Sequence, residues 1–300
     1  MPDTVAYVNG KFVPAATAAI TIFDRGFRWG DALYEVERTF HHKVFRLRDH
    51  MLRLERSLRY AQIAPGMAIE KIEATVEEMV ARNSPAFEPE NDMEVCQIIS
   101  RGTMDEPAKA NVVMYCREVE WSHVTKDLRD GRRLIIASTR RIPPQCLAPG
   151  AKISNKMSQM VAECEVKGVD PDARALMLDV YGNISEDTSA NVFFVLAGRL
   201  CTPSLANCLP GISRKVTLEI AERLGIPAEE GVYTPFDLWN CDELFLTSTS
   251  PCIYGVTHLN GRKVGSAFPG PITRRLTDGW KEVAGLDFVA QALKMGARRA

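Results

Sequence analysis

Hydrophobic residues recur with two different periods in the first third of the chain, and this mixture constrains the fold more than any other feature. They alternate at 5–8 and 11–13 around Asn9-Gly10, and again at 33–40 and 43–46 around His41-His42. Alternation on both sides of a short turn predicts a β-hairpin in each case. The spacing then becomes helical, with apolar side chains at Leu47, Met51, Leu54, Leu58 and Ala61. The pattern therefore predicts an α+β unit.

The pattern of the remaining sequence predicts that the whole chain forms two domains. A helix at 69–82 and strands at 95–100 and 112–116 complete a small α+β domain over residues 1–120. Residues 121–133 are polar and charged and end at Asp130-Gly131, so we expect an interdomain linker there. Residues 134–300 are expected to form a larger mixed α/β domain. Its predicted helices lie at 154–167 and 213–224, and its predicted strands at 134–138, 175–179, 191–196 and 243–247.

Composition and charge exclude several classes of protein. The 300 residues are 46% hydrophobic and can bury a large core, and the formal net charge of −1 gives no global field that favours nucleic acid or a membrane surface. No apolar run is long enough to span a bilayer, and the first residues lack the order of a signal peptide. The eight cysteines show no CxxC spacing, and the five histidines show no metal-ligand spacing. We therefore expect a soluble cytoplasmic enzyme with reduced thiols and no metal.

Four polar features suit one kind of cofactor. Lys152 follows a loop rich in proline and glycine, and Glu186 follows 34 positions later. The run 209–214 opens a predicted helix, and 247–250 closes a predicted strand. A pyridoxal phosphate (PLP) site needs a lysine for a Schiff base, an acid at the pyridine nitrogen and a cradle for the phosphate. This combination therefore predicts a PLP site.

Five motifs in order give the chain a wider resemblance. Two motifs lie in the first domain: residues 24–35 match Asp-Arg-Gly-x-x-x-Gly-Asp-x-x-Tyr-Glu, and residues 49–54 match an acidic-His-x-x-Arg-Leu helix. Three motifs follow later: residues 186–193 match Glu-x-x-x-x-Asn-x-Phe, residues 209–214 match Leu-x-Gly-Ile-Thr-Arg with Ser213 for Thr, and residues 242–245 match Asp-Glu-x-Phe. Together they resemble the class IV aminotransferases. These fold-type IV PLP enzymes include branched-chain and D-amino-acid aminotransferases, (R)-selective amine transaminases and aminodeoxychorismate lyase. The resemblance implies the D-amino-acid aminotransferase-like fold and a homodimer.

The resemblance also implies roles for individual residues. Lys152 would form the Schiff base and move the proton, and Glu186 would pair with the pyridine nitrogen. Arg53, Gly211, Ile212, Ser213 and Thr249 would hold the phosphate, which favours the unpaired N–H groups at a helix start. Ser213 is also an ordinary N-cap residue, and pattern does not separate the two roles. Asn191 would tie the Glu186 loop together. Two positions depart from the family pattern: Asp187 stands where Gly is usual, and Lys156 follows Asn155.

Arg53 has a second interpretation. It falls off the apolar stripe of its helix, so periodicity alone predicts a solvated position beside Arg46, Arg56 and Arg59. A basic helix face suggests a nucleic-acid-binding module, but the near-neutral chain and the lack of an aromatic stacking platform disfavour it. The family match instead makes Arg53 the phosphate-binding arginine.

Substrate identity is left open by the sequence. The resemblance places Tyr34 on the substrate side, and Arg38 or Arg101, as well as Arg28, are candidates to hold a carboxylate. The acids that follow Arg101-Gly102-Thr103 offer no carboxylate trap. We expect an aminotransferase acting between an amino acid or primary amine and a 2-oxo acid. Aminodeoxychorismate lyase is the alternative, disfavoured by Tyr34-Glu35-Val36 and by Thr247-Ser248-Thr249.

Overall fold

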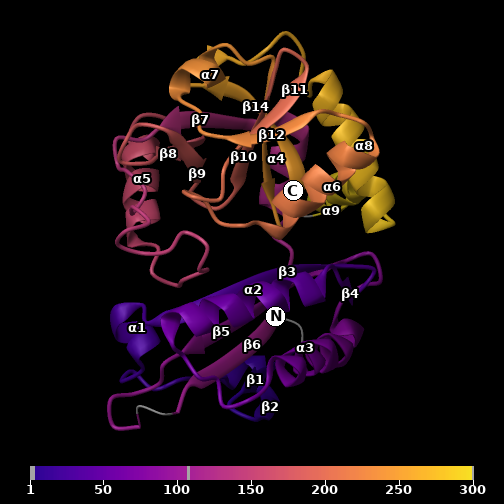
Figure 1. Cartoon of the computed structure of the whole chain (residues 1–300). Coiled ribbons are helices and arrows are strands. Elements are labelled where there is room, and N and C mark those ends of the chain that lie inside the picture. The colour runs from indigo at the N-terminus through magenta and orange to yellow at the C-terminus, as the bar shows by residue number, and fades with distance from the viewer. Residues whose placement is uncertain (1–3, 107–108, 299–300) are drawn as a thin grey trace. The chain divides into compact units, whose positions relative to one another are not determined.

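The computed structural model describes residues 4–106 and 109–298 (Figure 1). The chain divides into two compact units. Unit 1 comprises Met1–Glu120 with Ala151–Asn155, and unit 2 comprises Trp121–Gly150 with Lys156–Ala300. The division after Glu120 coincides with the boundary expected from the sequence. The short segment 151–155, which carries Lys152, belongs to unit 1 and not to the larger unit that was expected to hold it.

Unit 1 is built on an antiparallel sheet in the order β2-β1-β6-β5-β3-β4. The predicted hairpins are confirmed, since β1 pairs with β2 and β3 with β4. The residues at both turns, including Asn9, His41 and His42, have positive φ, as tight hairpin turns require. The strands are β1 Val5–Val8, β2 Lys11–Pro14, β3 Ala32–Phe40, β4 Lys43–Val44, β5 Met93–Ser100 and β6 Asn111–Glu118.

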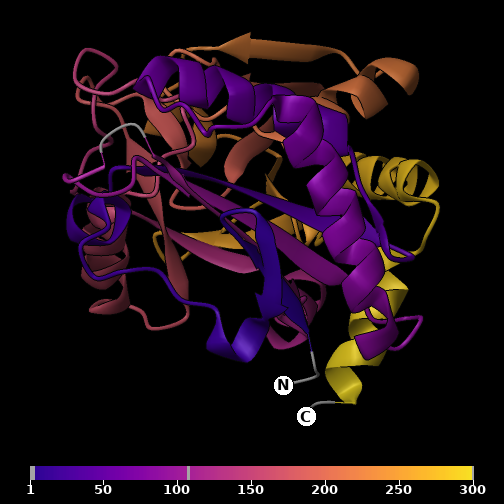
Figure 2. The ribbon, with the colours of Figure 1, turned by 90° about the horizontal axis from the view of Figure 1, so that it is seen from below.

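Two long helices, α2 Leu47–Ala61 and α3 Ile69–Asn83, cover one face of this sheet and appear in purple in Figure 2. Successive strand residues point to opposite faces, so Leu33 and Val95 turn toward the helices and join their apolar stripes in one core. A short helix, α1 Arg25–Trp29, begins at Asp24, whose carboxylate accepts hydrogen bonds from the next turn. The 3₁₀ turns are η1 Ala15–Thr17 and η2 Ser84–Ala86.

Unit 2 is built on a mixed sheet in the order β12-β11-β10-β13-β14-β7-β8-β9, with β15 beside β14. Most residues of the central strands β10, β13 and β14 are buried, and the rings of Phe193 and Phe245 stack at 5.2 Å between centroids. The strands are β7 Arg132–Ile136, β8 Ala173–Leu178, β9 Ile184–Asp187, β10 Asn191–Leu196, β11 Arg199–Pro203, β12 Ala228–Gly231, β13 Glu243–Ser248, β14 Cys252–Leu259 and β15 Arg262–Lys263.

The helices of unit 2 correct one prediction. Residues 121–133 do not form a linker, because Trp121–Asp130 is helix α4 and β7 follows at Arg132. Trp121 and Val124 are buried, and the Thr125 hydroxyl donates to the Ala292 carbonyl of α9 at 2.6 Å. The remaining helices are α5 Met157–Lys167, α6 Ile212–Arg223, α7 Pro235–Trp239, α8 Pro271–Ala284 and α9 Phe288–Ala297.

Both units have the predicted class, α+β for the first and mixed α/β for the second. In the part of the chain that the structure describes, no helix combines the length and apolar character needed to cross a membrane. All eight cysteines carry free thiols, and five of them are buried.

Candidate active site

Lys152 is held against the start of β3. The Tyr34 amide donates to the Lys152 carbonyl at 3.0 Å, and the Ser154 amide donates to the Ala32 carbonyl at 2.9 Å. The Lys152 amine lies 4.3 Å from the centroid of the Tyr34 ring. The segment therefore adds a short strand-like stretch to unit 1 and directs the amine over an aromatic face.

Ser57 joins Lys152 to Arg53. The Ser57 hydroxyl accepts a hydrogen bond from the Lys152 amide at 3.2 Å and donates to the Arg53 carbonyl, one turn back on α2, at 2.9 Å. Ser57 itself is 2% exposed. Sequence reasoning missed this residue, because a lone serine on a helix carries no motif and its role depends on the neighbouring segment.

Arg53 is buried, so the solvated position predicted by periodicity is wrong. Its Nε donates to Glu35 Oε1 at 2.7 Å and its Nη2 donates to Glu35 Oε2 at 2.6 Å. Only 6% of the residue is exposed. Arg56 and Arg59, in contrast, are exposed on the same helix. The four arginines therefore do not form one basic face, which removes the geometric basis of the nucleic-acid interpretation.

Glu186 is fixed in unit 2 by three donors. Oε1 lies 2.7 Å from Nη2 of Arg141, and Oε2 accepts from the Leu209 amide at 3.0 Å and from Asn191 Nδ2 at 3.3 Å. Asn191 also donates to the Leu209 carbonyl at 2.9 Å, so it ties this loop together as predicted. Arg141 was missed from the sequence, because nothing near it marks it as a partner of a distant carboxylate. These donors fix the position of the Glu186 carboxylate.

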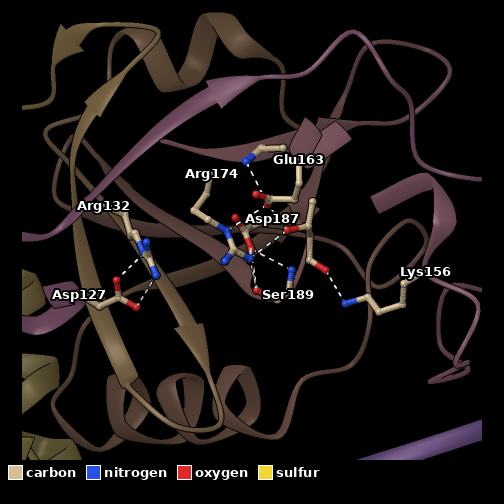
Figure 3. A network of polar contacts seen from close by, with 9 residues as sticks. Asp127, Arg132, Lys156, Glu163, Arg174, Asp187 and Ser189 are labelled. Atoms are coloured by element: carbon tan, nitrogen blue, oxygen red, sulfur yellow. Dashed lines mark hydrogen bonds and ion pairs between the residues drawn. The ribbon is translucent and has the colours of Figure 1, made fainter. Parts of the chain in front are cut away.

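Asp187, the first departure from the family pattern, points into a separate buried network (Figure 3). Its carboxylate accepts from the Ser189 amide at 2.8 Å and lies 3.7 Å from Nη2 of Arg174. Arg174 also pairs with Glu163 at 3.0 Å. Consecutive strand residues face opposite ways, so this second negative charge is turned away from Glu186 and is compensated where it is buried.

Lys156, the second departure, belongs to the same network in Figure 3. Its amine donates to the Thr188 carbonyl at 2.7 Å, two residues after Glu186. Lys156 is four positions after Lys152 in the chain. We assign it the structural role of holding the turn that follows Glu186.

The predicted phosphate cradle comes together at the start of α6. Gly211 is the N-cap residue, and no side chain caps this helix among the residues described. Ser213 is therefore not the N-cap that its residue type suggests. Its hydroxyl instead donates to the Ser248 carbonyl at 2.9 Å, which joins the helix start to the turn that contains Thr249. A Cβ at position 211 would collide with Asn191 Oδ1, so only glycine lets the chain pass this close.

These features fit a phosphate. The backbone N–H groups of a first helical turn, without a side-chain cap, are a ready anion site, and the helix dipole favours negative charge there. Within unit 2 the structure thus brings together Glu186, residues 209–213 and the turn after β13. Within unit 1 it brings together Tyr34, Arg53 and Lys152.

The candidate substrate arginines differ in their surroundings. Arg38 is 1% exposed and lies over the Phe40 ring at 4.6 Å. Its side chain points to the same face of the sheet as that of Tyr34, because the two residues are four positions apart on β3 and successive side chains alternate between the faces. Arg101 instead pairs with Asp31 at 2.9 Å and donates to the carbonyls of Ala61 and Gln62, which favours a structural role. Arg28 is exposed and stacks on Trp29 at 4.8 Å.

The sequence and fold of this chain are similar to those of several known proteins. A family model described as amino-transferase class IV matches residues 32–259. The chain is 32% identical over 286 residues to a putative branched-chain-amino-acid aminotransferase of Methanocaldococcus jannaschii, covering 92% of this chain and 95% of that protein. It is 27% identical over 285 residues to a D-alanine aminotransferase of Listeria monocytogenes, covering 90% and 92%.

The fold of this chain is also similar to that of a solved structure. It is the branched-chain aminotransferase of the thermophilic archaeon Thermoproteus uzoniensis, determined with norvaline. The TM-score is 0.84 at 26% sequence identity, and the match covers 94% of this chain and 95% of that one.

Proposed function

The chain belongs to the class IV aminotransferase family, and on that premise we propose that it uses PLP to transfer an amino group from an amino acid or primary amine to a 2-oxo acid. The observation that carries this proposal is the arrangement around Lys152. Its amine lies over the Tyr34 ring, and its backbone is joined through Ser57 to the helix that presents Arg53. This arrangement supports Lys152 as the residue that anchors the cofactor.

The other residues have complementary tasks. PLP, when bound, withdraws electrons from the carbon that loses its proton. Glu186, held by three donors, would accept a hydrogen bond from the protonated ring nitrogen. Ile212 and Ser213 at the start of α6, Gly211 before them, Thr249 and Arg53 would hold the phosphate. Lys152, once replaced at its anchoring position by the substrate amine, would take the proton from the substrate and return it on the cofactor side.

Tyr34 and Arg38 are the proposed substrate residues. They lie on one face of β3, the face over which the Lys152 amine is directed, and Arg38 can supply a planar fork of donors to a carboxylate. A donor panel of L-amino acids, D-amino acids and the two enantiomers of 1-phenylethylamine, each with a 2-oxo acid acceptor, tests the proposal. Activity with none of them, together with pyruvate release from aminodeoxychorismate, would favour the lyase.

Conservative replacement of Arg53 tests the phosphate assignment. Arg53→Lys keeps a positive charge beside Glu35 but loses the planar fork, so we expect the Kd for PLP to rise by about tenfold, the value of roughly one charge-assisted hydrogen bond. Titration of the apo-protein with PLP measures this change. Arg56→Lys and Arg59→Lys are matched controls, because both residues are exposed on the same helix. Equal PLP affinity for Arg53→Lys and the wild type would mean that α6 and Thr249 hold the phosphate without Arg53.

We also propose that the chain works as a homodimer in the cytoplasm. One stretch of unit 1 exposes several large apolar side chains, with Phe23 61% and Phe27 73% exposed. Ile20, Ile22 and Trp29 are exposed in the same stretch. An apolar surface of this density is costly to leave in water, and a second copy of the chain can cover it through the same patch on both subunits.

Disruption of this patch should produce a monomer. We expect the wild type to sediment at about twice 33.4 kDa and the double variant Phe23→Asp/Phe27→Asp at about 33.4 kDa, because a buried charge opposes association. Phe236→Asp is the control, since Phe236 in unit 2 is also 73% exposed. Sedimentation of the wild type as a monomer at all concentrations would contradict the dimer.

A further inference from the structure

Two glutamates on β3 are fully buried, side by side on one strand face. Glu35 and Glu37 are both 0% exposed, and both face helix α2. Burial of a carboxyl group without a donor or a counter-charge costs several kcal/mol, so each must be explained by its neighbours. The neighbours of the two glutamates differ sharply.

Glu35 receives three donors. Arg53 binds both of its oxygens, and His50 Nδ1 lies 2.9 Å from Oε2. Burial opposes ionisation of Glu35, but the charge of Arg53 and hydrogen bonds from Arg53 and His50 outweigh it and lower the pKa of Glu35 to about 2. Burial also lowers the pKa of His50, so the imidazole is neutral and Arg53 supplies the balancing charge.

Glu37 receives one donor. Gln97 Nε2 donates to its Oε2 at 2.8 Å, whereas its Oε1 is buried without a hydrogen-bond partner among the described residues. His50 Nδ1 is 3.7 Å away and already faces Glu35. Burial, and then the negative charge of Glu35, raise the pKa of Glu37 well above 4.5. The pKa values of the two carboxyl groups therefore shift in opposite directions, and Glu37 holds a proton more readily than Glu35.

The distances among Glu35, Glu37 and His50 would also allow a metal ion. A cation would have to share Glu35 with a guanidinium that already binds both oxygens. The charge of Glu35 is already balanced by Arg53, so the geometry favours a different role for Glu35.

We propose that Glu35 is a positioning residue for the cofactor phosphate: it fixes the plane of the Arg53 guanidinium through two parallel hydrogen bonds and so orients the remaining donors of Arg53. This inference rests on the proposed PLP function. A guanidinium is a rigid fork, and two bonds in its plane define its orientation completely. The Ser57 hydroxyl also donates to the backbone carbonyl of Arg53 at 2.9 Å, which ties the backbone from which this side chain leaves to the Lys152 segment.

If Glu35 acts through its charge, removing that charge changes the PLP affinity in one direction, and if Glu35 acts by orienting Arg53, the affinity changes in the other direction. The proposal is therefore testable. Glu35 is a negative charge beside a residue that binds an anion. If Arg53 acted by charge alone, Glu35→Gln would strengthen PLP binding. If Glu35 acts by orienting Arg53, the same change weakens PLP binding, since glutamine can accept only on one side of the fork.

The experiment measures two ligands on the purified apo-protein. We expect Glu35→Gln to raise the Kd for PLP by about tenfold, the equivalent of about 1.4 kcal/mol. The Kd for pyridoxal, which has no phosphate, should stay within about twofold, a free-energy change below roughly 0.5 kcal/mol. General damage to the fold would weaken both ligands. Glu37→Gln is the matched control: it changes a carboxyl group that is equally buried on the same strand face but is bonded to Gln97, whereas Arg53 donates to Glu35, and both affinities should be unchanged.

Three outcomes would overturn the proposal: tighter PLP binding by Glu35→Gln, unchanged PLP binding, or equal losses of PLP and pyridoxal. If Glu35→Gln does not fold, Glu35→Asp is measured instead, since it keeps the charge and is too short for the paired bonds. It should also lose PLP and retain pyridoxal. Failure of the wild type to bind PLP would refute the proposed function itself, whereas normal binding by wild type and loss in Arg53→Lys alone would refute only the role of Glu35.

Discussion

Lys152→Ala should fold normally and lose transamination by more than about 10²- to 10⁴-fold, the usual cost of removing one catalytic base, because the proposed covalent anchor of the cofactor is lost as well. The side chain is only partly buried, and the hydrogen bonds of Lys152 with Tyr34 and Ser57 are made by its backbone, so alanine preserves these bonds and loses the contact of the amine with the Tyr34 ring. Steady-state rates with the best donor of the panel measure the activity. The free energy of unfolding of the apo-protein checks that the fold is intact.

A second measurement separates loss of the anchor from loss of the proton carrier. A small primary amine in the buffer, such as ethylamine, should restore part of the activity to Lys152→Ala, since it can take the proton that the missing side chain carried. Lys167→Ala is the control, because Lys167 is exposed at the end of α5 and should leave the rate unchanged. Near-normal activity of Lys152→Ala without added amine would refute the assignment.

The sequence predicted those parts of the fold whose signal is local. The hairpins of unit 1 are marked by alternation on both sides of a turn, and α2 and α3 by an apolar stripe. Helix α4 was mistaken for a linker because its exposed face is rich in charge. Its core contacts come from Trp121 and Val124 and from α9, which lies at the far end of the chain. A helix with a narrow buried stripe looks polar in sequence unless its partner is known.

Prediction from sequence has the same limit for single residues of the candidate site. The motifs pointed to Lys152, Glu186 and the start of α6 as candidates, because each is a short run with its own pattern. They did not show that Glu35 binds Arg53, which lies 18 positions away on another element, or that Arg141 faces Glu186. Arg53 was ambiguous for this reason: periodicity measures apolar burial, and a buried ion pair contradicts it without disturbing the helix.

Glu186→Gln should lower kcat by about 10- to 100-fold, since the variant removes the proposed charged hydrogen bond to the ring nitrogen of the cofactor, which is worth about 1.5 to 3 kcal/mol. Glutamine keeps the shape of the side chain, and its one oxygen can still accept from Leu209 or Arg141 but cannot stabilise a positive charge on the ring. A fall in the apo-protein's free energy of unfolding is also expected, because Arg141 would lose its carboxylate partner.

A matched carboxylate separates catalysis from stability. Glu165 in α5 accepts hydrogen bonds from the Ser138 amide and from the amide and hydroxyl of Thr139, so Glu165→Gln also removes a well-bonded charge from unit 2. It should lower the free energy of unfolding and leave kcat within about twofold, since it touches neither the 209–213 run nor Glu186. A change in kcat of less than about threefold for Glu186→Gln, equivalent to under roughly 0.7 kcal/mol of activation barrier, would contradict the assignment. Glu186 would then be a structural partner of Arg141 and Leu209, and another acid would have to face the ring nitrogen.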